Sequence, residues 1–397
     1  MSIVAIFHSG EITINAYYLA AALKQQHIDV QFYLYTPKNT YKYNYLVCLL
    51  QKVKDEFSTF ELKGSFFASF LTKPNRLFEI FGTQLHALII NPLLPGKTRK
   101  LFDASKFTSI ITIGQGSLYW LYKTDPQAMN KAIHYSLEIQ KTSDPYFITP
   151  QLGALINWES RLLKKAKCLI IQDVFRAEAL LNCKLENSHL KFFFLPVALL
   201  GKTIRRNEDY LYHELKIPRE KKILLYFGAL YSERYIKEVT ETFDKSVNDN
   251  WVLVLHGPND FSSLIPDASK INASHNLLNY EDLYKIICSA TIGLALYDNR
   301  WPNTRFTAFS SEKIARYLQA GVPFIAFKNE SYTKLKGEFN CCALIVNISD
   351  LNNAIEEIME NYDVFRENCF KAYDKHYNIS NSILPLSEFV HNNPNSA

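Results

Sequence analysis

The sequence has no apolar segment long enough to span a membrane. None of its 397 residues lies in an uncharged apolar run of 18 or more residues, which is about the length that a bilayer requires. Residues 1–7 lack a basic segment and a small-residue cleavage site, and they have the pattern of a first strand rather than a signal peptide. We therefore expect a cytoplasmic protein.

Patterns typical of metal sites and disulfides are also missing. The seven cysteines are scattered without a C-x-x-C pair, and the ten histidines form neither H-x-H nor H-E-x-x-H. Scattered cysteines in apolar stretches are typical of reduced, buried thiols. No D-x-D motif occurs, so the chain lacks a common motif that binds the magnesium ion of a diphosphate ligand. We predict metal-independent chemistry without a cofactor.

Several nucleotide and hydrolase motifs are absent. No G-x-x-x-x-G-K-[ST] loop and no G-x-S-x-G elbow occurs, so a P-loop nucleoside triphosphatase and an α/β-hydrolase are both unfavoured. Gly114-Gln115-Gly116 follows a predicted strand, but position 119 is Tyr and no ribose-binding carboxylate follows at the expected distance. A dinucleotide-dependent redox enzyme is therefore unfavoured as well.

Strand and helix patterns do alternate along both halves of the chain, which predicts parallel sheets covered by helices. A length of 397 residues also favours two domains. We predict an α/β fold with two Rossmann-like domains, whose strands would direct their carboxyl ends toward a shared crevice. The predicted parts are an N-terminal domain (1–196), a linker (197–221), a C-terminal domain (222–370), and a C-terminal helix and tail (371–397) that could pack back on the N-terminal domain.

Positive charge is concentrated in residues 38–106, which contain eleven Lys or Arg against five Asp or Glu. The same stretch holds several phenylalanines. Basic residues among exposed aromatics suit contact with anionic lipids, so this insert predicts peripheral contact with the inner face of the membrane. The alternative is a solvated helical face with the aromatics in the core. No recognition helix or aromatic RNA-binding motif supports nucleic acid as a partner.

The segment 309–327 predicts a helix, a glycine stop and a buried strand. Ser310 or Ser311 can cap this helix, and Gly321 fits the left-handed position that ends helices. Lys313 lies in the first turn, where free backbone N–H groups and the helix dipole favour an anion. The sequence therefore predicts an anion site at residue 313, with an ordinary capped helix as the alternative.

Other candidate site residues follow predicted strands, where ligands bind in open α/β sheets. In the second half, backbone N–H groups with two cations, Lys313 and Arg234, could hold a nucleotide diphosphate without metal. The candidates there are Gly228, Arg234, His256, Gly257, Ser311, Glu312, Lys313 and Arg316. The candidates in the first half are His8, Gly10, Glu11, His134 and Glu138.

Five segments in order resemble the nucleotide-sugar domain of GT-B glycosyltransferases, most of all the family 4-like bacterial enzymes that build surface polysaccharides. They are Leu225-Tyr-Phe-Gly-Ala-Leu, Trp251-Val-Leu-Val-Leu-His-Gly-Pro, Tyr280-Glu-Asp-Leu-Tyr, Ile292-Gly-Leu-Ala-Leu-Tyr and Ser311-Glu-Lys-Ile-Ala-Arg-Tyr-Leu-Gln-Ala-Gly-Val-Pro. The resemblance covers about 110 residues. It implies a GT-B fold, in which two Rossmann-like domains face a central cleft, and a nucleotide-sugar donor bound by the second domain.

Two positions depart from this resemblance. Many family members carry a ribose-binding Glu where this chain has Arg316, and Glu312 lies one turn earlier on the same helix face. Glu312 could replace that contact or pair with Arg316. Family members also often have Arg where this chain has Ala229. We therefore expect donor recognition to differ in detail.

Sugar transfer with inversion needs a base for the acceptor hydroxyl, and Glu138 is the first choice before Glu11 and His8. Gly10 and His134 would lie on the acceptor side. A retaining enzyme would need no such base. The leading hypothesis is a transferase that moves a sugar to a glycan or lipid-linked acceptor. The alternatives are a nucleotide-sugar 2-epimerase and a non-catalytic GT-B partner of an active transferase.

Overall fold

The computed structural model describes residues 2–9, 12–36, 44–63, 99, 101–140, 150–228, 235–258, 270–276 and 278–393. Most of the basic insert that was expected at 38–106 therefore lies outside the described residues. Three candidate site residues also lie outside them: Gly10, Glu11 and Arg234.

The chain forms two compact units. The first contains Met1–Leu195 together with Ser382–Ala397, and the second contains Pro196–Asn381. Residues 197–221, which were expected to form a linker, belong to the second unit. They are anchored there because Leu211 and Ile217 are buried within an otherwise polar stretch.

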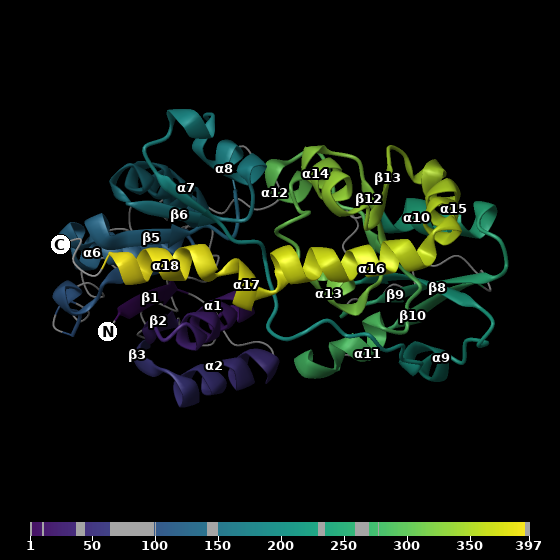
Figure 1. The fold of residues 1–397 in the computed structure, drawn as a ribbon, viewed down its shortest axis with the longest axis horizontal. Helices are drawn as coiled ribbons and strands as arrows, with labels where there is room; N and C mark the ends of the chain where they lie inside the picture. The colour runs from purple at the N-terminus through teal and green to yellow at the C-terminus, as the bar shows by residue number, and fades with distance from the viewer. Residues whose placement is uncertain are drawn as a thin grey trace. The chain divides into compact units, whose positions relative to one another are not determined.

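The first unit is built on a seven-stranded parallel sheet with the order β3-β2-β1-β4-β5-β6-β7 (Figure 1). Its strands are β1 (Ile3–Ser9), β2 (Asp29–Thr36), β3 (Ser58–Lys63), β4 (Ser109–Ile113), β5 (Ala132–Tyr135), β6 (Cys168–Ile171) and β7 (Lys191–Phe194). The strand order reverses next to β1, since β1 pairs with both β2 and β4. Such a reversal creates the crevice at which open α/β sheets bind ligands.

Two helices of the first unit, α1 and α8, begin at side-chain caps. The Thr13 hydroxyl accepts a hydrogen bond from the Ala16 N–H at the start of α1, and the Asp173 carboxylate does the same for the Arg176 N–H at the start of α8. The helices of the first unit are α1 (Ile14–Gln25), α2 (Asn44–Glu56), α6 (Gln115–Thr124), α7 (Pro150–Leu162), α8 (Val174–Leu181) and α18 (Leu384–Asn392). The short helix α17 (Ile379–Ser382), of which all but the last residue belongs to the second unit, leads into α18.

The second unit has a six-stranded parallel sheet with the order β10-β9-β8-β11-β12-β13. Its strands are β8 (Lys222–Phe227), β9 (Trp251–His256), β10 (Ile271–Ser274), β11 (Ile292–Ala295), β12 (Phe324–Phe327) and β13 (Cys342–Ile345). Its helices are α9 (Tyr210–Glu214), α10 (Ile236–Ser246), α11 (Leu283–Ile287), α12 (Pro302–Arg305), α13 (Glu312–Ala320), α14 (Glu330–Phe339), α15 (Leu351–Glu360) and α16 (Tyr362–Ala372). The order reverses next to β8, as it does next to β1.

These two sheets confirm the prediction of an α/β chain with two Rossmann-like parts. The sequence patterns missed two edge strands, β3 and β10, because both carry polar residues that weaken an apolar pattern. They also missed α6, whose first turn contains Gly116, and α14, which contains Gly337; glycine weakens a helical pattern. The other strands and the helices α1, α8, α10, α13 and α15 lie within two residues of the ranges that the sequence predicts, whereas no helix was predicted at α16.

Candidate active site

Three candidate residues of the second unit meet at the carboxyl ends of β8 and β9. The Gly228 N–H donates to the carbonyl oxygen of His256 at 2.9 Å, and the Gly257 N–H donates to the Ser274 carbonyl at 3.1 Å. Gly228 has a φ of 110°, a conformation that favours glycine. The chain therefore turns sharply at the point where the strand order reverses.

His256 is buried and uncharged at neutral pH. Its Nδ1 lies 3.0 Å from the Ser274 hydroxyl, and burial, aided by the nearby His275, lowers the pKa of His256 to about 4. An imidazole with this pKa is neutral at pH 7. It can donate a hydrogen bond to a ligand or accept one from it, but it adds no positive charge.

The helix α13 begins beside these loops, and its N-terminal backbone is not capped by a side chain. Ser311 is the N-cap residue, but the prediction that its hydroxyl caps the helix is wrong, because that hydroxyl lies 2.7 Å from the Tyr297 hydroxyl instead. First-turn N–H groups without a side-chain cap and the positive end of the helix dipole form a favourable environment for an anion.

Lys313 adds a cation at this helix start. The residue is only 7% exposed, and its Nζ lies 4.5 Å from the ring centroid of Tyr226 and 5.2 Å from that of Tyr297. A Cβ placed on Gly228 would lie 3.7 Å from Lys313 Cε, so the lysine extends past this glycine. Aromatic faces stabilise a cation that is partly removed from water. The side chain of Lys313, which extends from α13, is thus held in a defined position against Tyr226 of β8.

Glu312 and Arg316 form an ion pair one turn apart. Arg316 Nε donates to Glu312 Oε1 at 2.7 Å, and the Tyr280 hydroxyl donates to the same oxygen at 2.6 Å. The Arg316 guanidinium also lies over the Tyr280 ring, with 4.2 Å between its Cζ and the ring centroid. Of the two roles that the sequence left open for Glu312, the structure contains the pairing with Arg316.

The described candidates of the first unit, His8, His134 and Glu138, lie in or directly after β1 and β5, and the two histidines are buried. His8, the penultimate residue of β1, has Nε2 3.3 Å from the Thr13 hydroxyl, and burial lowers its pKa to about 4. His134 in β5 is fully buried, with Nδ1 3.0 Å from the Thr112 hydroxyl and Nε2 2.8 Å from Glu159 Oε1. Because protein groups occupy both ring nitrogens, His134 supports the site rather than presenting a surface to an acceptor.

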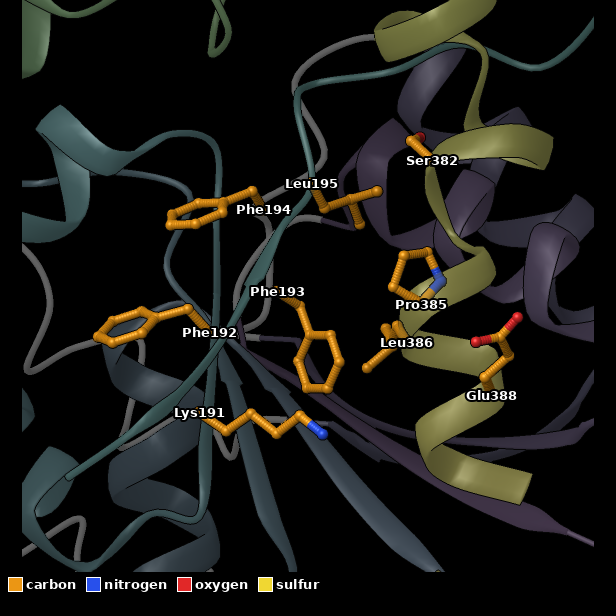
Figure 2. A pocket seen from close by; sticks show the side chains of 9 residues that line it. All are labelled: Lys191, Phe192, Phe193, Phe194, Leu195, Ser382, Pro385, Leu386 and Glu388. Carbon is orange, nitrogen blue, oxygen red and sulfur yellow. The ribbon is translucent and has the colours of Figure 1, made fainter. Parts of the chain in front are cut away.

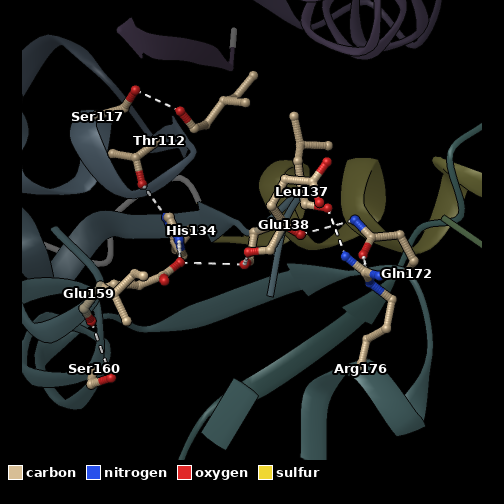
Figure 3. A network of polar contacts seen from close by, with 12 residues as sticks. Thr112, Ser117, His134, Leu137, Glu138, Glu159, Ser160, Gln172 and Arg176 are labelled. Carbon is tan, nitrogen blue, oxygen red and sulfur yellow. Dashed lines mark hydrogen bonds and ion pairs between the residues drawn. The ribbon is translucent and has the colours of Figure 1, made fainter. Parts of the chain in front are cut away.

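Glu138 follows β5 on a loop that buried polar groups hold in place (Figure 3). Arg176 Nη2 donates to the Leu137 carbonyl at 2.8 Å, and Arg176 Nε donates to Gln172 Oε1 at 2.6 Å. Gln172 Nε2 in turn donates to the Ser136 carbonyl at 2.9 Å. Burial lowers the pKa of the Arg176 guanidinium, whereas the carboxylates of Glu138 and Asp173 raise it. Glu138 itself is exposed.

The patterns of the sequence did not single out Thr112, Gln172 or Arg176 as parts of a site. One signal was available, because Thr112 and His134 are polar residues within apolar strands, and they pair across the β4–β5 register. Polar side chains that are paired inside a buried sheet need hydrogen bonds, either to each other or to a third group. Glu159 on α7 is that third group for His134.

A separate pocket lies between β7 and α18 and contains none of the predicted site residues (Figure 2). Its volume is about 380 Å³. The residues that line it are Lys191, Phe192, Phe193, Phe194, Leu195, Ser382, Pro385, Leu386 and Glu388.

Among the described residues, no three His, Cys, Asp or Glu side chains are arranged to hold a metal ion. No helix in the described ranges combines the length and the apolar character needed to cross a bilayer.

Solved structures of the GT-B fold resemble the whole chain. Sucrose-phosphate synthase from Thermosynechococcus elongatus aligns with a TM-score of 0.67 at 14% identity and covers 99% of both chains. HepE of Anabaena in complex with UDP aligns at 0.66 and 13%, covering 99% of this chain and 100% of that one. WaaG, a glycosyltransferase involved in lipopolysaccharide biosynthesis, aligns at 0.60 and 12%, covering 98% and 99%. The GT-B fold prediction is confirmed.

No protein-family model matches the chain. A comparison with curated proteins finds no match either. At identities of 12–14%, similarity to the solved structures shows the fold, while the activity has to be argued from the chemistry of the site.

Proposed function

We propose that this GT-B chain is a glycosyltransferase whose second unit binds a nucleotide-diphosphate sugar. The observation that carries the proposal is the position of Lys313, a buried cation at the uncapped start of α13 and beside Gly228. A diphosphate at this point would meet backbone N–H groups, a helix dipole and an ammonium group together. The UDP bound to HepE supports this ligand class.

The chemical task of this site is to stabilise the departing diphosphate. When the bond between sugar and phosphate breaks, negative charge builds up on the phosphate oxygens, and fixed donors lower the barrier most where water is excluded. Lys313 and the first-turn N–H groups of α13 are such donors. They supply the charge stabilisation that a divalent metal supplies in other transferases.

The acceptor would be activated in the first unit. In this proposal Glu138 removes the proton from the acceptor hydroxyl as the new glycosidic bond forms, while the sugar inverts at its anomeric carbon. The buried Arg176 and Gln172 hold the loop of Glu138 but are not themselves in contact with the reacting atoms. We further propose a surface glycan or a lipid-linked glycan as the acceptor, which the sequence resemblance favours.

Calorimetric titration tests the donor site. UDP, GDP and ADP are titrated into the wild-type chain and into Lys313→Met, which keeps the length of the side chain against its aromatic neighbours. Loss of a hydrogen bond to a charged group costs about 1.5–3 kcal/mol, so we expect the affinity for the bound nucleotide to fall roughly 10- to 150-fold. Lys334→Met is the control. Lys334 is an exposed residue of α14 that also lies over an aromatic ring, that of Phe309, but it is not part of the proposed site.

The outcomes separate the three functional hypotheses. Unchanged affinity in Lys313→Met would remove this site from the account. Conversion of a donor sugar in the absence of any acceptor would identify an epimerase. Failure of the wild-type chain to bind any nucleotide, together with stable association with another transferase, would identify a scaffold.

A further inference from the structure

The surface formed by α6 and α7 of the first unit carries positive charge without an exposed carboxylate. Residues 115–124 and 150–167 contain five Lys or Arg and a single acid, Glu159, which is buried against His134. Arg99 adds a further guanidinium, whose Nε and Nη2 donate to the carbonyls of Thr124 and Lys123 at 2.7 and 2.9 Å. Lys123 and Arg99 therefore place positive charge at the end of α6, beside one partly exposed acid, the C-cap residue Asp125.

Aromatic rings lie between these cations. Trp158 on α7 contacts Tyr119 and Tyr122 on α6, with ring centroids 5.2 and 6.0 Å apart, and all three side chains are partly exposed. We call Tyr119, Tyr122, Lys123, Trp158, Arg161 and Lys165 the α6–α7 patch. The two helices pack directly against each other, so the patch is one continuous surface.

Each cation of the patch lies over an aromatic ring. Lys123 Nζ is 5.5 Å from the Tyr119 centroid and 5.7 Å from that of Trp158. Arg161 Cζ is 5.8 Å from the Trp158 centroid, and Lys165 Nζ is 5.0 Å from that of Tyr122. The inner faces of the rings pack on the core of the first unit. Their other faces contact the charged groups.

We propose that the α6–α7 patch docks the protein on the surface of an anionic lipid bilayer. Tyr and Trp prefer the headgroup level of a membrane, because their rings are apolar and their N–H or O–H groups remain hydrated there. Lysine and arginine side chains place their apolar stems at that level and their charges among lipid phosphates. The absence of an exposed acid on both helices removes the repulsion that would oppose such contact.

This inference goes beyond the proposed function and does not depend on it. The patch lies on described helices, whereas the basic insert expected to touch the membrane lies mostly outside the described residues. Vesicle binding and nucleotide binding are separate measurements on separate units, so either proposal can fail alone. If both hold, the unit that carries Glu138 would be held where lipid-linked acceptors are found.

Vesicle co-sedimentation of the full chain tests the proposal. We expect wild-type protein to sediment with vesicles of phosphatidylglycerol and phosphatidylethanolamine but not with phosphatidylcholine alone, and to be released by high salt. The triple variant K123E/R161E/K165E should lose at least tenfold in partitioning. The control K237E/K328E/K371E makes the same charge change at exposed positions of the second unit and should bind normally.

Trp158 provides a second test that a folding defect cannot imitate. Vesicles with dibrominated acyl chains quench tryptophans that enter the bilayer interface, so they should quench the wild type strongly and W158F weakly. Equal quenching in W158F, unchanged sedimentation of the triple charge variant, or failure of the wild type to bind anionic vesicles would each overturn the proposal. Heparin binding as strong as vesicle binding would also overturn it, since it would identify a soluble polyanion as the partner.

Discussion

At the scale of single residues, two glycines determine how closely α13 approaches its neighbours. A Cβ on Gly293 would overlap the ring of Tyr317, whose hydroxyl donates to the Leu225 carbonyl at 2.9 Å. Gly321 ends α13 with a φ of 65°, and a Cβ there would overlap the ring of Phe370. The helix that carries Lys313 is thus fixed at its middle and at its end by positions without a side chain.

Substitution at Gly321 should therefore destabilise the second unit. Gly321→Ala combines a left-handed backbone with an overpacked ring, and we expect it to lower the free energy of unfolding by about 2–4 kcal/mol. The matched control is Gly337→Ala in α14, where a Cβ meets nothing within 4 Å, and this change should raise stability by about 0.5–1 kcal/mol. Urea unfolding followed by circular dichroism measures both. A Gly321→Ala chain as stable as the wild type would contradict the account.

The sequence predicted some of these residue positions and not others. The left-handed stop at Gly321 and the place of Lys313 in the first turn are confirmed, because both depend on residues close in sequence. The aromatic rings of Tyr226 and Tyr297 around Lys313 were not predicted, since they come from segments that only the sheet brings together. Ser311 illustrates the same limit, because its hydroxyl bonds to Tyr297 rather than to its own helix.

At the scale of secondary-structure elements, buried polar contacts fix residues 136–138, which follow β5, while the Glu138 side chain is exposed. His134 and Glu159 join strand to helix in the core, while Arg176 on α8 holds the carbonyl of Leu137. The sequence placed β5 and α8 well, since their apolar patterns are clear. It could not place the Arg176 contact, because residues 137 and 176 come together only when β5 and β6 pair.

Glu138→Gln tests the role of this segment in catalysis. The change removes the carboxylate and keeps its shape, so turnover should fall by roughly 100- to 10,000-fold if Glu138 is the general base. Nucleotide affinity should remain at the wild-type value, because that affinity belongs to the second unit. Donor consumption with a competent acceptor measures turnover. Retained turnover would dismiss the base role and favour a retaining mechanism.

At the scale of the whole molecule, the chain contains two units with the same pattern of strand order. The alternation of helices and strands was sufficient to predict both units, because each βαβ step is local. The return of the chain into the first unit depends on contacts between distant residues: Phe389 of α18 packs 5.2 Å from Phe193 of β7, and His391 Nε2 lies 2.9 Å from the Gln26 carbonyl oxygen. The sequence analysis expected that a C-terminal helix and tail could pack back on the N-terminal domain, but it could not name these contacts, because they leave no periodic signal in the sequence.

Each unit also contains a buried histidine whose pKa is lowered by burial, which predicts acid sensitivity of the whole fold. His8 and His256 both have a pKa of about 4 when folded, whereas the usual value is 6.5. Below pH 6.5 the unfolded chain therefore binds more protons, so stability should fall as the pH drops from about 6.5 toward 4. Each histidine contributes on the order of 3 kcal/mol at the acid end.

The double variant H8Q/H256Q isolates this effect from the titration of carboxylates. Urea unfolding at pH 7 and pH 5 should give a clearly smaller loss of stability in the variant than in the wild type. An equal loss in both proteins would show that these histidines do not control the acid response.

The central claim is that a nucleotide diphosphate binds at the start of α13, and a crystal structure with the nucleotide identified by calorimetry tests it most directly. The account predicts phosphate oxygens within hydrogen-bond distance of Lys313 Nζ and of first-turn N–H groups of α13, next to Gly228. A nucleotide bound elsewhere on the chain, with no phosphate oxygen near Lys313 Nζ, would contradict it.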